Sequence, residues 1–119
     1  MHEYSVVAAL IELCEEQARA HHAQSIKRVV VALGERSGVE EQLFCSAFDV
    51  FKLDSLCASS ELKIIKKPVK VRCDSCGYEA SLKDIAQGEC PKCKEQRLSM
   101  IEGKEMYLQS LEMEVGDEG

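Results

Sequence analysis

Two C-x-x-C pairs constrain this 119-residue chain more than any other feature of its sequence. Cys73 and Cys76 form the first pair, Cys90 and Cys93 form the second, and 13 residues separate the two pairs. Two such turns facing one another bring four thiolates to a single tetrahedral ion. Four thiolates leave no position open for water, so the pattern predicts a structural zinc site rather than a catalytic one.

Paired cysteines have other uses, and two disulfides, a redox dithiol or an iron–sulfur cluster are the alternatives. Two matched pairs exceed what a redox dithiol needs, which favours zinc. The metal is expected to hold residues 69–101 together, because this segment has too few apolar residues for a core of its own. The small cluster it could form comprises Val71, Tyr78, Leu82, Ile85, Leu98 and Ile101.

The charge of the chain argues against nucleic acid as a partner. The sequence carries 21 acidic and 15 basic residues, for a formal net charge of −6. Residues 68–103 are formally neutral, and zinc with four thiolates would add a charge of about −2 there. Binding to phosphates needs clustered Lys and Arg, and so does adhesion to an anionic membrane surface.

Location in the cytoplasm is expected from the amino terminus and from the cysteines. No apolar stretch is long enough for a transmembrane helix. The segment MHEYSVV contains Glu3 and no basic region, so it does not have the pattern of a signal peptide. Seven cysteines, an odd number, suit reduced thiols better than a disulfide framework.

Apolar spacing predicts two helices and several strands around the cysteine segment. The helices are expected over residues 3–22 and 38–56, and a capping box of Ser37 and Glu40 would begin the second. The apolar face of the second helix would comprise Leu43, Phe44, Ala47, Phe48 and Phe51. Strands are expected over residues 26–33, 61–67, 97–101 and 105–113, while residues 73–96 are rich in turn residues.

These elements predict an α+β fold in which two helices pack on a small mixed sheet. A zinc-ribbon-like module with the four cysteines would be inserted before the last strand. The expected domains are a nickel-binding domain of residues 1–67 plus 104–119 and a zinc-binding module of residues 68–103. The first domain is called nickel-binding because of the candidate metal ligands at the amino terminus of the chain.

The amino terminus offers a second set of metal ligands. The amine of Met1, together with the amide and imidazole nitrogens of His2, can wrap one ion in fused chelate rings. Glu3 would complete four ligands, and such a nitrogen-rich set suits Ni(II) or Cu(II) better than zinc. The alternative is that His2 is a mobile terminal side chain. The predicted helix that follows at once favours an anchored terminus.

Three segments of the chain together resemble the HypA/HybF hydrogenase maturation proteins: MHEYSVV, VVVALGERSGV and the C-x2-C-x13-C-x2-C module. The resemblance covers essentially the whole chain. It implies a nickel metallochaperone, not an enzyme, that delivers Ni(II) to nickel–iron hydrogenase and carries structural Zn(II). His2 matches the nickel-binding histidine of the family, and Glu3 matches its acidic neighbour. The four cysteines match the zinc ligands.

The resemblance also implies the partners of the chain. These are a HypB-like GTPase, the hydrogenase large subunit and, as for some members, urease maturation proteins. Glu40 is a further candidate for an acidic contact with nickel. The alternative function is that of a zinc-ribbon adaptor without a nickel role, and a thiol redox enzyme is a second rival.

The remaining cysteines and histidines have simpler expected roles. Cys14, Cys45 and Cys57 are predicted to be small apolar residues in the structure rather than metal ligands. His21 and His22 are expected to be solvated at the end of the first helix. The acidic residues after residue 104 are expected to form a solvated face, with docking of a partner as the alternative.

Overall fold

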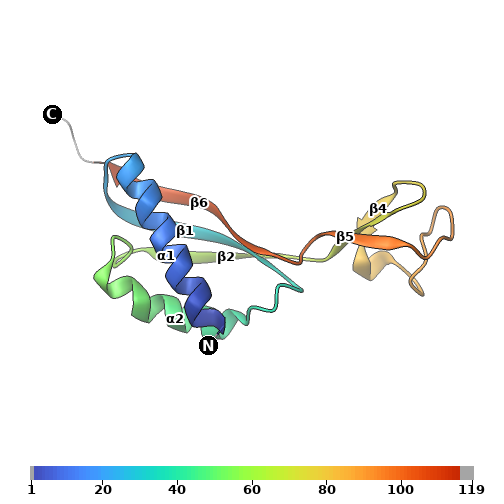
Figure 1. Cartoon of the computed structure of the whole chain (residues 1–119), viewed down its shortest axis with the longest axis horizontal. Coiled ribbons are helices and arrows are strands. Elements are labelled where there is room, and N and C mark those ends of the chain that lie inside the picture. The colour runs from blue at the N-terminus through green and yellow to red at the C-terminus, as the bar shows by residue number, and fades with distance from the viewer. Residues whose placement is uncertain (1, 116–119) are drawn as a thin grey trace. The chain divides into compact units, whose positions relative to one another are not determined.

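The computed structural model describes residues 2–115, apart from the side chain of His2, and it confirms the α+β class (Figure 1). The helices are α1 (His2–Ala20), α2 (Glu41–Phe51) and the short 3-10 helices η1 (Lys52–Asp54) and η2 (Leu82–Asp84). The strands are β1 (Ala23–Gly34), β2 (Glu61–Lys67), β3 (Lys70–Cys73), β4 (Glu79–Ser81), β5 (Leu98–Glu102) and β6 (Met106–Val115). Within this part of the chain, no helix is long and apolar enough to cross a membrane.

The chain divides into two compact units. The first is drawn from residues 1–32, 39–65 and 107–119, and the second from residues 33–38 and 66–106. The sequence did not indicate that residues 33–38 belong with the cysteine segment. That the two units act as a nickel-binding and a zinc-binding domain stays a prediction.

The sheet of the first unit has the strand order β2-β1-β6, and contacts at both ends of β1 and β2 show that these two strands run parallel. Arg28 in β1 lies 3.0 Å from Glu61 at the start of β2. Beyond the other end of β1, the backbone N–H of Glu35 donates to the carbonyl of Lys67 at the end of β2, at 2.9 Å. Parallel neighbours need a crossover connection, and α2 lies in the segment that makes it.

Strand β6 forms one edge of this sheet, and its contacts with β1 show that the two strands run antiparallel. Ser25, near the start of β1, lies 3.5 Å from Glu114, near the end of β6. At the other end, the N–H of Gly34 donates to the carbonyl of Glu105 at 3.0 Å. The last strand therefore returns beside the first, as the sequence predicts.

The core of the first unit lies between this sheet and the two helices. The three consecutive valines of β1 are buried, as their run predicts. In α2, the predicted apolar face is too wide, because Leu43 is 50% exposed and Phe51 is 39% exposed. The buried side chains of the helices include Val7, Leu10, Ile11, Cys14, Ala18, Phe44, Ala47 and Phe48.

The predicted capping box at the start of α2 is wrong. The N-cap residue is Glu40 rather than Ser37, and the side chain of Glu40 makes no capping hydrogen bond. Ser37 lies in the bend before it. The helix ends at Phe51 rather than at residue 56, and η1 continues the chain.

The second unit contains a three-stranded antiparallel sheet in the order β4-β3-β5. Strand β4 was not predicted, because its three residues carry no apolar pattern. Val69 and Val71 are buried beside the cysteines. The predicted cluster is only partly right, since Tyr78 is 40% exposed and Ile101 is 38% exposed. Because so few apolar side chains are buried, the stability of the second unit depends largely on the cysteine cluster.

Candidate metal centres

The four cysteines of the two C-x-x-C pairs meet in the second unit, as predicted. Their sulfur atoms all lie within 4.8 Å of one another. The Sγ atoms of Cys73 and Cys93 are 3.5 Å apart, and those of Cys76 and Cys90 are 3.6 Å apart. A tetrahedral ion with sulfur ligands at about 2.3 Å needs sulfurs about 3.8 Å apart, so the cluster fits such an ion closely. No disulfide joins any of the seven cysteines, all of which lie within the described residues.

The two cysteine turns repeat one hydrogen-bond pattern. The N–H of Gly77 donates to the carbonyl of Cys73 at 2.9 Å, and the N–H of Lys94 donates to that of Cys90 at 2.8 Å. The N–H of each first cysteine also donates to the carbonyl five residues later. Gly77 has φ 79° and Lys94 has φ 70°, so the same left-handed position closes both turns. The sequence points to this position only in the first turn, where it is glycine.

The turns also favour negative charge on the sulfurs. Burial opposes ionisation of Cys90, but the N–H groups of Cys93 and Lys92 outweigh it and lower its pKa to about 6. The N–H of the other cysteine in its pair is the largest cause of the lowered pKa of Cys73. At Cys93, the N–H of Glu95 favours the thiolate, yet burial and three crowded thiols raise the pKa to about 12. Four thiolates this close need a cation to ionise together.

The predicted amino-terminal site is described only in part. His2 begins α1, but its side chain and Met1 lie outside the described residues. Glu3, in the first turn of α1, is 8% exposed. Its Oε2 accepts a hydrogen bond of 3.1 Å from the backbone N–H of Glu40. A carboxylate from α1 thus caps α2, and no local sequence pattern predicts this contact.

The other cysteines divide into a buried pair and a single residue. Cys14 and Cys57 are fully buried, as expected, whereas Cys45 is half-buried. The hydrogen bond from the thiol of Cys14 is the largest cause that lowers the pKa of Cys57, to about 7. Contact with Cys57, together with burial, raises the pKa of Cys14. These two thiols join α1 to the loop after η1 within the core.

Comparison with known proteins identifies the family to which the chain belongs. A family model described as hydrogenase/urease nickel incorporation, metallochaperone, hypA matches residues 1–113. The chain belongs to the HypA family. The HypA family consists of nickel metallochaperones rather than enzymes, which confirms the role that the resemblance implied.

Individual members of the HypA family are similar along the whole chain. The hydrogenase maturation factor HypA of Wolinella succinogenes is 60% identical over 119 residues, which cover all of both chains. The hydrogenase/urease maturation factor HypA of Helicobacter pylori is 44% identical over 114 residues, or 95% of this chain and 97% of that one. The solution structure of the Ni metallochaperone HypA from Helicobacter pylori superimposes with a TM-score of 0.75 and 42% identity. That match covers 96% of this chain and 98% of that one.

Proposed function

We propose that this chain binds Ni(II) at its amino terminus and delivers it during maturation of nickel–iron hydrogenase. The observation that carries the proposal is the match to the HypA family along the chain, from residue 1 to residue 113. The Wolinella succinogenes relative, identical at 60% of positions, is a hydrogenase maturation factor. The Helicobacter pylori relative is a hydrogenase/urease maturation factor, which makes urease a second candidate recipient.

The proposed nickel ligands are the nitrogens of His2 with the carboxylate of Glu3. The contact between Glu3 and the backbone of Glu40 supports an acidic environment there, since it brings two glutamates to the start of α2. Glu40 is then a further candidate contact. Imidazole and amide nitrogens bind nickel only when deprotonated, so nickel affinity should fall as the pH drops.

The proposed ligands of Zn(II) are Cys73, Cys76, Cys90 and Cys93. The sulfur distances support a tetrahedral ion, and four sulfurs leave no place for a reacting water. Zinc would stay bound while nickel is exchanged, because the thiolates suit zinc and the nitrogen set suits nickel. The proposed location is the cytoplasm, where the thiols stay reduced. The proposed partners there are a HypB-like GTPase and the hydrogenase large subunit.

Metal titration of the untagged chain tests both sites at once. Wild type is expected to retain one zinc and to take up one nickel, while His2→Ala keeps zinc and loses nickel. His21→Ala is the matched control, because it removes an imidazole from the other end of α1. Glu3→Gln in the same series reports whether the carboxylate contributes. If His2→Ala binds nickel as tightly as wild type, the amino-terminal site is wrong and the adaptor function becomes the better one.

A further inference from the structure

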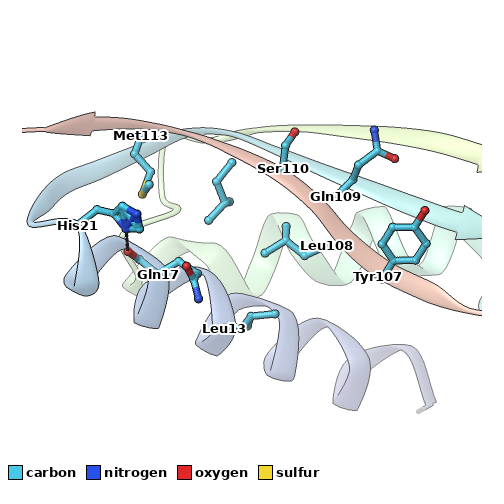
Figure 2. A pocket seen from close by; sticks show the side chains of 9 residues that line it. Leu13, Gln17, His21, Tyr107, Leu108, Gln109, Ser110 and Met113 are labelled. Atoms are coloured by element: carbon cyan, nitrogen blue, oxygen red, sulfur yellow. Dashed lines mark hydrogen bonds between the residues drawn. The ribbon is translucent and has the colours of Figure 1, made fainter.

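A groove runs along α1 and β6 in the first unit, and neither candidate metal site uses it (Figure 2). Its volume is about 480 Å³. Leu13 and Gln17 of α1, and His21 just after it, project toward β6, where Leu108 and Met113 form part of the facing wall. These three residues lie at four-residue steps along α1 and its C-terminal end, so they form one stripe along the groove.

The groove follows the open edge of the sheet. Strand β6 is last in the order β2-β1-β6, so among residues 2–115 it has a neighbouring strand on one side only. An edge strand presents a row of N–H and C=O groups that another extended chain can pair with. A chain added there would direct every second side chain toward α1, into the groove.

The walls of the groove are apolar where such side chains would enter. Leu13 is 40% exposed and Tyr107 is 48% exposed, although both are large apolar residues beside the groove. Leu111 and Met113 are half-buried on β6. Gln17 also lines the groove, and its backbone carbonyl oxygen lies 3.2 Å from Nδ1 of His21, a contact that holds the imidazole ring on the wall. Five of the nine lining residues are apolar, so apolar side chains can pack in the groove, with Gln17, His21, Gln109 and Ser110 as the polar groups beside them.

The acidic rim consists of Glu112 and Glu114, which are exposed on the edge strand β6. Because they alternate with Leu111 and Met113, they point to the face of the sheet opposite the groove. No Asp, Glu, Lys or Arg is among the residues that line the groove itself. Arg28 approaches Glu112 only to 3.8 Å, and the Glu112 side chain stays 60% exposed. A second copy of this chain would bring acidic rim against acidic rim, so a basic partner fits better.

We propose that the groove binds an extended segment of a partner protein in which apolar and basic side chains alternate. The segment adds a strand to the edge of β6. Its apolar side chains enter the groove against α1, and its basic side chains meet the acidic rim. The proposal does not depend on nickel, because none of these groups belongs to the proposed nickel or zinc ligands.

The test uses the zinc-loaded full chain without nickel and a synthetic probe peptide of about ten residues that alternates Val and Lys. Binding is followed by fluorescence anisotropy, and amide NMR shifts map the bound face. Saturable binding is expected, with shifts in β6 and along the groove stripe of α1, and with weaker affinity at higher salt. N-methylation of alternate peptide nitrogens should weaken binding about tenfold, since it removes several backbone hydrogen bonds.

Two variants of the chain test the walls and the rim separately. Gln17→Trp fills the groove with a large side chain at an exposed helix position and is expected to block binding. The double change Glu112→Lys and Glu114→Lys should weaken the Val–Lys peptide and strengthen a Val–Glu peptide. Asp84→Lys, an exposed acidic residue of the second unit, is the matched charge control and should change neither.

Several outcomes would overturn the proposal. Equal binding of the N-methylated peptide would show that no strand is added. Equal binding of the Val–Glu peptide to wild type would show that the rim does not select basic partners. A dimer joined through β6, detected by light scattering, would assign the edge to a second copy. None of these results bears on nickel uptake, so the proposed function is tested separately.

Discussion

Lys94 adopts a left-handed backbone conformation, and the residue at the same position of the other cysteine turn is a glycine, Gly77. Its φ is 70°, against 79° for Gly77. A residue with a Cβ atom is disfavoured there by about 1–2 kcal/mol. An added Cβ at Gly77 would meet nothing within 4 Å, so the cost at either position is conformational rather than steric crowding by neighbours.

Lys94→Gly is therefore expected to stabilise the zinc-loaded chain, and Gly77→Ala to destabilise it. The net effect of each should be about 0.5–1 kcal/mol, because glycine also gains entropy in the unfolded chain. Lys94→Ala is the matched control, since it removes the same charged side chain but keeps the Cβ atom. Thermal unfolding at fixed zinc measures all three, and an equal gain for Lys94→Ala would trace the effect to the side chain instead.

Glu3 has a structural contact in addition to its proposed part in nickel binding. Its carboxylate accepts the N–H of Glu40 and so caps α2. Glu3→Ala should lower the free energy of unfolding by about 1 kcal/mol, as loss of a cap does. Glu12→Ala on the same helix should change it by less than about 0.5 kcal/mol, because Glu12 is exposed. Urea unfolding compares them, and equal effects would show that the cap contributes nothing.

At the scale of elements, the sequence predicts those parts that local patterns specify. The strand β1 follows from its valine run, and the four-cysteine cluster follows from two local ligand pairs. The start of α2 cannot be predicted from a local pattern, because the carboxylate that caps it belongs to Glu3, 37 residues before Glu40. The left-handed position of Lys94 could not be foreseen either, since only the shared hydrogen-bond pattern of the two turns reveals it.

Strands β3 and β4 are joined by an ion pair in register. Arg72 lies opposite Glu79, and its Nε and Nη2 atoms lie 3.0 Å and 2.6 Å from one carboxylate oxygen. The hydrogen bond from Arg72 is the largest cause of the lowered pKa of Glu79, whose ordinary value is 4.5. A carboxyl whose pKa is lower in the folded chain stabilises the fold above its unfolded pKa. That contribution is lost as the pH falls through the folded value.

Arg72→Gln should consequently return the pKa of Glu79 toward 4.5. Lys70→Gln should shift it less, because Lys70 Nζ lies 3.8 Å from the carboxylate. An NMR titration of the Glu79 carboxyl carbon between about pH 3 and 7 measures both shifts, with bound zinc followed in the same samples. A pKa of Glu79 that is the same in wild type and Arg72→Gln would contradict the assigned cause.

At the scale of the whole molecule, the two units differ in what holds them together. The first has a core of buried side chains from β1, α1 and α2. The second has few buried apolar residues beside Leu33, Val69, Val71 and two of the cysteines. When metal binding is part of folding free energy, a unit with so small a core depends on its ion. Because of this difference, the predicted division into two domains can be tested by measuring whether the two units unfold separately.

Removal of zinc should unfold the second unit and leave the first folded. Amide hydrogen exchange after chelation, or in Cys73→Ser, is expected to lose the protection of β3, β4 and β5, while α1 and the start of β1 keep theirs. Cys45→Ser is the matched control, because Cys45 lies outside the four-cysteine cluster. This variant should retain zinc and the exchange protection of both units. Loss of protection in both units together would show one cooperative fold, and the predicted separation into two domains would then be wrong. Retained protection in β3–β5 without metal would instead show that the small apolar cluster suffices.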